Sequence, residues 1–333
     1  MESAKELGEE RIHEVITKNL EKDPKELLGY NDDAIAIPID EERILIAHTN
    51  ALVSSTDVLP RMPLKSIGVK AVVMNISDIV SKGAKPLTLL FSWGIPKDYS
   101  IKALLKISSG LNETARKYGT YVTGGDINES YEFFISGVAL GICKKDELMP
   151  RSGARPGDIL AITGELGLTS MAYKILLENF EAPHRIKLNA LNSVFFPKAR
   201  LHEALALAKT RSVTACMDIS DGLAKSLHWL SKASKVGFKV SEIPIPKEIS
   251  EFALKKRLDP LKLALYEGGE EYELLVCIKP NKWNKALKKV LEAGGRLYKI
   301  GEAIEERKLI FQKDEETEEE IENIGWEHFL KWG

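Results

Sequence analysis

The segment Arg151–Asp158, with the sequence RSGARPGD, most constrains the fold of this chain. Gly and Pro at this density are typical of a connector and disfavour a helix or a strand. The connector divides 333 residues into two parts, and this length suits about two domains. We therefore predict an N-terminal domain over residues 1–150 and a C-terminal domain over residues 151–333.

Hydrophobic periodicity predicts helices and strands in both parts. The N-terminal part has predicted helices at 8–20, Leu64–Lys82 and Ile101–Lys117, and strands at Ala34–Ile37, Arg43–His48, Leu87–Ile95, Tyr121–Val122 and Phe133–Cys143. The C-terminal part has predicted strands at Ile159–Thr163, Val213–Met217, Lys239–Ile243, Glu273–Ile278 and Tyr298–Ile304, and helices at Leu168–Glu178, Ala190–Lys209, Leu223–Lys235 and Lys282–Ala293. The mixture predicts an α+β (mixed α/β) fold of two domains, and the acidic stretch Glu315–Glu322 predicts a solvated loop.

Composition excludes several classes of protein. The net charge of −2 gives no support to nucleic-acid binding, which needs a concentrated basic face. No apolar run approaches the ~18 residues that span a bilayer, and Met1–Arg11 lacks the apolar core of a signal peptide. The isolated Cys143, Cys216 and Cys277 predict buried small side chains and disfavour a disulfide or zinc site. We expect a protein of the reducing cytoplasm that binds neither nucleic acid nor membrane.

Short motifs rich in Asp and Gly lie at or near the ends of the predicted strands. They are Asn31-Asp32-Asp33, Thr49-Asn50, Gly124-Gly125-Asp126, Met217–Gly222 and Gly268–Glu271, with Asn75–Asp78 on the polar side of the long helix. Taken alone, an Asp at a strand end is usually a turn or helix-cap residue. Several such motifs together favour a shared site, because ligands often bind at the loops beyond strand ends.

Neither a P-loop nor the Gly-rich loop of protein kinases is present, so any binding of ATP must use other groups. Gathered carboxylates repel one another unless a cation neutralises them. Mg²⁺ prefers hard oxygen ligands and commonly bridges carboxylates to substrate phosphates. The acidic motifs therefore favour a metal–phosphate site, which suits phosphoryl transfer.

The order of these motifs resembles the thiamine-monophosphate kinase family, whose superfamily also contains aminoimidazole ribonucleotide synthetase and selenophosphate synthetase. The resemblance covers roughly residues 28–329 and includes the stretches KAVVMNISDIVSKGAKP (Lys70–Pro86), RSGARPGD, TGELG, MDISDGL, GGEEYELL and GWEHF (Gly325–Phe329). MDISDGL, RSGARPGD and the ending GWEHF together are the specific set within the superfamily. The stretch STDVLPRM (Ser55–Met62) is similar to the archaeal branch of the family.

This resemblance implies a fold and a reaction. The N-terminal domain would pair with that of a second subunit in a shared β-barrel, so that the protein is a homodimer. The C-terminal α/β domain would pack beside the barrel, with ATP in the cleft between the domains. The γ-phosphate of the co-substrate ATP would pass directly to thiamine monophosphate, giving thiamine diphosphate, with several Mg²⁺ ions and no phosphoenzyme.

The matching motifs also imply roles for single residues. The implied metal ligands are Asp33, Thr49, Asn50, Asp78, Asp126, Asp218 and Asp221, of which Asp78, Asp126 and Asp218 are the implied catalytic residues. The implied ATP contacts are Gly125, Arg151 and Ser220, and we expect the backbone near Gly164–Gly167 to steady the triphosphate. The implied contacts to the substrate are Asp57, Glu270 and Trp326. A Trp suits the thiazolium ring as a cation–π partner, although packing in the core is an alternative role for Trp326.

Three positions depart from the family pattern. Asn31 replaces the usual Gly, Asn50 replaces an Asp that ordinarily holds Mg²⁺, and GGEE replaces GGED. An amide oxygen can coordinate a hard cation but brings no charge. These departures leave open a non-catalytic paralogue that binds nucleotide. A sister enzyme that phosphorylates another small molecule is a further alternative, which the ending Gly325–Phe329 disfavours.

Overall fold

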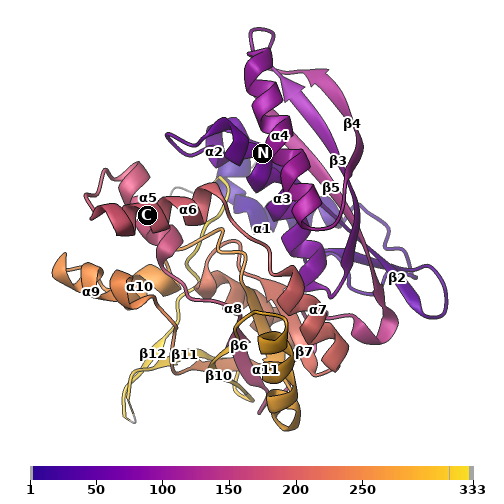
Figure 1. The fold of residues 1–333 in the computed structure, drawn as a ribbon. Helices are drawn as coiled ribbons and strands as arrows, with labels where there is room; N and C mark the ends of the chain where they lie inside the picture. Colours follow the sequence, from indigo (N-terminus) through magenta and orange to yellow (C-terminus); the bar gives the residue numbers. More distant parts are fainter. Residues whose placement is uncertain (1–2, 315, 330–333) are drawn as a thin grey trace.

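The structure is a computed structural model that describes residues 3–314 and 316–329 (Figure 1). It contains two β-sheets, one in each part of the chain, with helix α3 between them. This arrangement confirms the mixed α+β fold of two parts. Among the described residues, no helix combines the length and the apolar character that crossing a membrane requires.

The N-terminal sheet has five strands in the order β1-β2-β5-β3-β4. Neighbouring strands are antiparallel except β3 and β4, which are parallel because helix α4 connects them. The strands are β1 (Ile35–Pro38), β2 (Arg43–Val53), β3 (Lys85–Ile95), β4 (Val122–Glu129) and β5 (Phe134–Lys144). The helices of this part are α1 (Ala4–Thr17), α2 (Ser54–Asp57), α3 (Leu64–Ser81) and α4 (Ile101–Lys117), followed by the short 3₁₀ helix η1 (Lys145–Glu147).

Helix α3 is buried on nearly all sides because it packs on the sheet, on α4 and on strand β7 of the C-terminal part. Its contact with α4 depends on two glycines. A Cβ at Gly68 would lie 2.1 Å from the carbonyl oxygen of Ile107, and a Cβ at Gly110 would lie 2.1 Å from that of Lys65. The close crossing fixes α3, and with it the NISD motif, between the two sheets.

The C-terminal sheet has seven strands in the order β12-β11-β8-β10-β6-β9-β7, in which only β11 and β8 are parallel. The strands are β6 (Ile159–Ile162), β7 (Val213–Asp218), β8 (Gly237–Val240), β9 (Leu274–Ile278), β10 (Tyr298–Ile304), β11 (Leu309–Gln312) and β12 (Glu318–Glu320). The helices are α5 (Leu168–Leu177), α6 (His184–Phe195), α7 (Leu201–Thr210), α8 (Leu223–Ser234), α9 (Lys247–Lys255), α10 (Pro260–Leu265), η2 (Pro280–Lys282) and α11 (Trp283–Glu292).

Several predicted elements need correction. The single helix predicted over Ala190–Lys209 is two helices, α6 and α7, because Pro197 cannot continue a helix and disfavours helical backbone at Phe196. The acidic stretch Glu315–Glu322 is not wholly a loop, since β12 pairs with β11, although its three residues are exposed as expected. Residue 315 lies outside the described residues.

Two motifs predicted at strand ends lie inside strands. Strand β2 continues to Val53 and so contains Thr49 and Asn50, while β4 contains Gly124–Asp126. Gly and Asp disfavour strands, but pairing with a long neighbouring strand overrides that preference here. The sheet is open, with β1 and β4 at its edges, so the described chain forms no closed barrel by itself. The shared barrel of a dimer stays a prediction.

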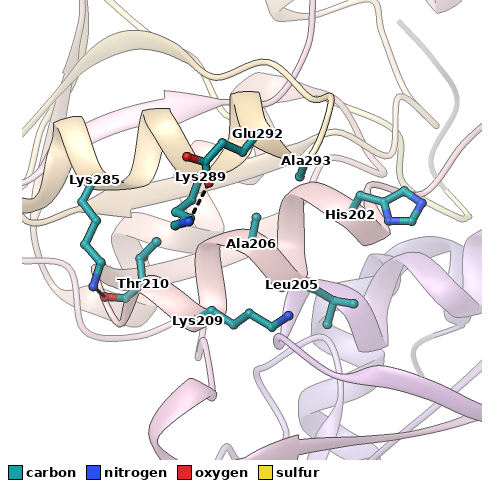
Figure 2. Close-up of a pocket in the computed structure, with 9 residues that line it drawn as sticks. All are labelled: His202, Leu205, Ala206, Lys209, Thr210, Lys285, Lys289, Glu292 and Ala293. Carbon is teal, nitrogen blue, oxygen red and sulfur yellow. Dashed lines mark hydrogen bonds and ion pairs between the residues drawn. The ribbon is translucent and has the colours of Figure 1, made fainter.

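A surface groove of about 440 Å³ lies between helices α7 and α11 (Figure 2). Its lining includes three lysines, of which Lys289 is paired with Glu292 at 2.5 Å and Lys285 donates to the carbonyl oxygen of Thr210 at 3.3 Å. The groove contains none of the predicted site residues.

Candidate active site

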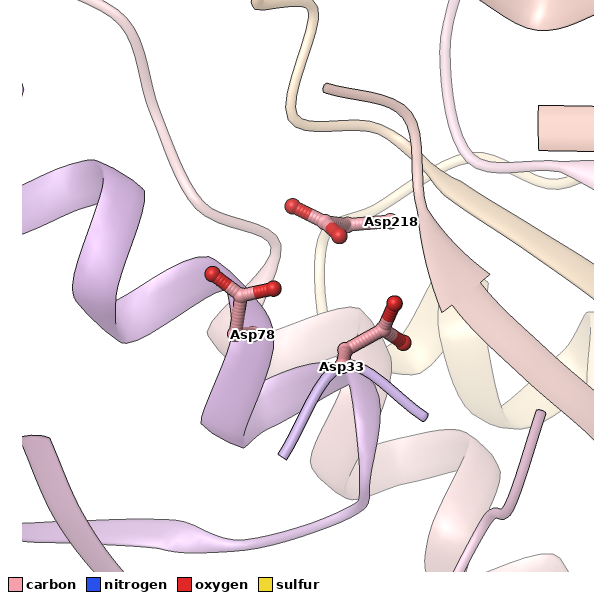
Figure 3. Close-up of side chains that lie close together, drawn as sticks. All are labelled: Asp33, Asp78 and Asp218. Carbon is pink, nitrogen blue, oxygen red and sulfur yellow. The ribbon is translucent and has the colours of Figure 1, made fainter. Parts of the chain in front are cut away.

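Three predicted metal ligands meet between the two parts of the chain (Figure 3). Asp33 comes from the loop before β1, Asp78 from α3 and Asp218 from the end of β7. Each offers a carboxylate oxygen, and these oxygens lie within 4.8 Å of one another. Residues separated by up to 185 positions are thus brought to one point, as the motifs led us to expect.

Two cations, one of them fully buried, hold the acidic loop before β1 in place. Nζ of Lys82, which is fully buried, lies 2.7 Å from Oδ1 of Asp32 and 2.6 Å from Oδ2 of Asp33, and donates to the carbonyl oxygen of Cys216 at 2.8 Å. Arg151 pairs with the carboxylate of Asp33. Burial acts to raise the pKa of Asp33, but Arg151 and Lys82 hold that pKa well below its usual range.

Among the described residues, no Lys or Arg forms an ion pair with the other two carboxylates of the cluster, although the charges of Lys82 and Arg151 act to lower the pKa of both. Burial, followed by the nearby charges of Asp218 and Asp33, raises the pKa of Asp78 well above its usual value. Burial and the charge of Asp33 raise the pKa of Asp218 to about 7, although the Ser77 hydroxyl donates a hydrogen bond to it at 2.5 Å. Both carboxylates are therefore short of positive charge.

The neighbouring His48 does not supply that charge. Burial lowers its pKa to about 4, so the ring is neutral at pH 7. Its Nε2 lies 3.1 Å from Oδ2 of Asp78 without the geometry of a hydrogen bond. A divalent cation fits this cluster, because carboxylate oxygens are the ligands that Mg²⁺ prefers and its charge would offset their repulsion.

A second group of predicted residues is joined by Lys70 of α3. Its side chain is only 2% exposed, and its Nζ donates to the carbonyl oxygen of Asp57 at 2.7 Å and pairs with the carboxylate of Glu270. The two residues implied as substrate contacts in distant parts of the sequence therefore share one lysine. The structure brings Asp57 and Glu270 together, and their contact with a substrate stays a prediction.

The loop after β7 connects this group to the C-terminal segment. The carbonyl oxygen of Ser220 accepts from the backbone N–H of Glu270 at 2.6 Å, and that of Asp221 accepts from the backbone N–H of Trp326 at 3.0 Å. Burial raises the pKa of Asp221 to about 6. Asp221 is not part of the three-carboxylate cluster, but Ser220, Asp221, Glu270 and Trp326 are neighbours.

Gly125 and Asp126 lie three strands away from Asn50, whose backbone N–H donates to the side chain of Asn75 in α3 at 3.1 Å. In the sheet, Asn50 pairs with Gly137, Gly137 with Phe91, and Phe91 with Gly125. Three strand spacings of about 4.8 Å put Asp126, next to Gly125, roughly 14 Å from Asn50. The carboxylate of Asp126 instead accepts from Asn128 at 2.7 Å.

Thr49 and Asn50 of β2 make hydrogen bonds within the sheet. The hydroxyl of Thr49 donates to the carbonyl oxygen of Gly137 at 2.9 Å. The side-chain oxygen of Asn50 accepts from the backbone N–H of Ala51 at 2.8 Å. Metal binding by Thr49, Asn50 and Asp126 stays a prediction.

Sequence reasoning missed the roles of Lys70 and Lys82. The sequence did contain an indication that both lysines are buried, because both lie in the apolar helix pattern predicted over Leu64–Lys82. A Lys inside a buried run is rare unless an acidic group pairs with it. What the pattern did not contain was the identity of the acidic partners, which come from distant loops.

The raised pKa values predict that the metal-free protein loses stability as pH rises. For Glu271, burial raises the pKa from 4.5 to about 8, and one of its carboxylate oxygens is buried without a hydrogen-bond partner. Between these pH values the folded state binds more protons than the unfolded state, so the free energy of unfolding falls with rising pH. We expect Glu271→Gln to be more stable than the wild type by at least about 1 kcal/mol at pH 8.

Denaturant unfolding in EDTA at several pH values measures this difference. The gap between Glu271→Gln and the wild type should widen steadily as pH rises, because only the wild-type residue must lose a proton. Parallel stability curves for the two proteins would contradict the assignment of a neutral buried Glu271.

Known proteins provide an independent comparison. Residues 31–143 match the family described as AIR synthase related protein, N-terminal domain, and residues 155–314 match the corresponding C-terminal domain family. The two matches lie on either side of the connector. They define the class of the fold: a two-domain protein of the AIR synthase related type, with an acidic cluster between its domains.

Within that class the chain belongs to the thiamine-monophosphate kinase family. It is 35% identical to a thiamine-monophosphate kinase of Pyrococcus horikoshii over 326 residues, 97% of each chain. It is 33% identical to that of Methanocaldococcus jannaschii, covering 91% of this chain and 96% of the other. A solved structure described as "AaThiL complexed with AMPPCP and TMP" superposes with a TM-score of 0.84 at 26% identity, covering 98% of this chain and 99% of that chain.

Proposed function

We propose that this protein transfers the γ-phosphate of ATP to thiamine monophosphate and so produces thiamine diphosphate. The meeting of Asp33, Asp78 and Asp218 between the domains is the observation that carries the proposal. Thiamine-monophosphate kinases that match nearly the whole chain support the proposal. A similar structure in complex with AMPPCP, an ATP analogue, and TMP also supports it.

The proposed reaction is a direct, in-line phosphoryl transfer. Asp33, Asp78 and Asp218 would hold Mg²⁺, whose charge offsets that of the bound phosphates. Arg151, already beside Asp33, carries a further positive charge toward the same place and is the proposed contact to an ATP phosphate. The acceptor is a phosphate oxygen that is already anionic at neutral pH, so no side chain needs to act as a strong base.

We further propose that the protein is a homodimer that forms through the N-terminal sheet and works in the cytoplasm. All eight residues of the edge strand β4 are exposed, and Ile127 is 72% exposed. An edge strand with open backbone groups and apolar side chains suits pairing with a second copy. Such a dimer would also place the Asp126 of each copy in the interface, away from the cluster of its own chain.

The two alternatives left open by the sequence are not favoured. A non-catalytic paralogue is disfavoured because relatives that match nearly the whole chain are thiamine-monophosphate kinases. A sister enzyme with another substrate is disfavoured because the curated relatives named above share one activity.

A coupled assay of ADP release with thiamine monophosphate tests the proposal. We expect turnover with ATP and Mg²⁺, its loss when EDTA removes the metal, and its return when Mg²⁺ is added in excess. ADP release that does not depend on thiamine monophosphate, or none with any amount of Mg²⁺, would contradict the proposed function.

A further inference from the structure

Lys70 is a buried charge that the acidic cluster does not use. It lies in α3 with a side chain that is 2% exposed, while Lys65 of the same helix is 46% exposed and pairs with Glu113 at the surface. A buried ammonium group must be paired to offset the loss of hydration. The position of its partners therefore indicates what the lysine does.

Both partners belong to connecting segments rather than to the core. Asp57 is the last residue of the short helix α2, and Glu270 belongs to the loop before β9. Lys70 thus joins the connection between β2 and α3, which is called the Asp57 loop below, to one loop of the C-terminal part. These two segments also contain the residues with predicted contacts to the substrate.

The loop that contains Glu270 has a backbone conformation that requires support. Glu270 has a φ of +59° and Tyr272 a φ of +52°, which non-glycine residues seldom adopt. The carboxylate of Glu270 is held from two sides, by Lys70 and by the hydroxyl of Tyr173, which donates to it at 3.3 Å. Loss of Lys70 would leave this carboxylate with one fewer partner and a less fixed position.

The distance along α3 relates this pair to the acidic cluster. Lys70 and Asp78 are eight residues apart, which corresponds to about 12 Å along the helix axis. A substrate with its phosphate at the cluster and its organic part at Glu270 would have to span a distance of this order.

We propose that Lys70 is a positioning residue that fixes Glu270 and the Asp57 loop for the organic part of the phosphorylated substrate, and that it has little effect on ATP. The proposal rests on the proposed function for the identity of the substrate. It assigns Lys70 no contact with the reacting phosphate.

Steady-state kinetics of Lys70→Met, with Lys65→Met as the matched control from the same helix, test this proposal. For Lys70→Met we expect the KM for thiamine monophosphate to rise about tenfold or more, and the KM for ATP to change less than about twofold. Lys65→Met should leave both constants unchanged because its ion pair is exposed. The double variant Lys70→Met/Glu270→Gln should raise the KM for thiamine monophosphate no more than the larger single effect, since both changes act on one pair.

Thermal unfolding shows whether Lys70→Met acts on the position of Glu270 or on the stability of the whole protein. The double variant removes both charges, so it should recover most of the loss in Tm of Lys70→Met while its KM for thiamine monophosphate stays high. The proposal is wrong if Lys70→Met raises both KM values and the double variant restores both of them together with Tm. It is also wrong if Lys70→Met keeps a normal KM for thiamine monophosphate. A wild-type protein without turnover would contradict the proposed function. Calorimetric binding of thiamine monophosphate to the same variants would then decide the role of Lys70.

Discussion

Replacing Asp78 by Asn should lower the turnover number by about 10³-fold or more while the fold persists. Asp78 is the carboxylate of the cluster whose pKa burial and two neighbouring carboxylates raise most clearly. The ionised carboxylate of Asp78 is unfavourable in the metal-free fold. We therefore infer that this carboxylate binds a cation. The same ADP-release assay measures the loss, and near-normal turnover would refute the role of Asp78 in holding Mg²⁺.

The same variant should not be less stable than the wild type. Asn has nearly the same shape, and it removes a charge that repels Asp33 and Asp218. We therefore expect the Tm measured in EDTA to stay the same or to rise by a few degrees. Glu113→Gln, which changes an exposed carboxylate of α4, is the control that should alter neither turnover nor Tm by much.

Replacing Lys82 by Met should lower the free energy of unfolding by about 3–5 kcal/mol. The change leaves Asp32 and Asp33 buried without the ammonium group that lies 2.6–2.7 Å from them, so that Asp33 keeps the pairing with Arg151 and a hydrogen bond from the Ser81 hydroxyl. Denaturant unfolding in EDTA at pH 7 measures the loss. The loss should shrink in excess Mg²⁺, because a bound cation replaces part of the missing charge.

Two further variants make this result specific. Lys65→Met, at the exposed start of α3, should change the free energy of unfolding by less than about 1 kcal/mol. Lys82→Met/Asp32→Asn should recover part of the loss because it removes one of the unpaired charges. If Lys65→Met and Lys82→Met lower the free energy of unfolding by similar amounts, the buried ion pairs of Lys82 do not contribute more to stability than an exposed ion pair.

The hydrophobic periodicity of the sequence predicted α3 and α4 well, whereas the helix predicted over 8–20 is α1 at Ala4–Thr17 and α2 was not predicted. Helix α4 has the predicted bounds, and α3 ends one residue before the predicted Lys82. Both helices have a continuous periodic pattern that ends at a glycine, and such patterns depend little on distant contacts. The predicted helix over Ala190–Lys209 was wrong because its periodicity continues across Pro197, whose local effect decides the break.

The candidate site was predicted in its composition but not in its geometry. The sequence identified Asp33, Asp78 and Asp218, and the structure places them together. It also suggested Thr49, Asn50 and Asp126 at strand ends, whereas β2 and β4 continue through these residues. Strand length depends on pairing with neighbouring strands, and a local pattern contains no information about that pairing.

The sequence by itself determined the fold class, the family and the chemical type of the site, because these depend on local periodicity and on the order of short motifs. Only the tertiary structure decided which charges meet. Lys70 and Lys82 look alike in the sequence, yet one joins two loops near the predicted substrate contacts and the other holds the acidic loop of the cluster. The physical reason is that a charge acts over a few ångströms in space, and chain folding sets those distances independently of separation in sequence.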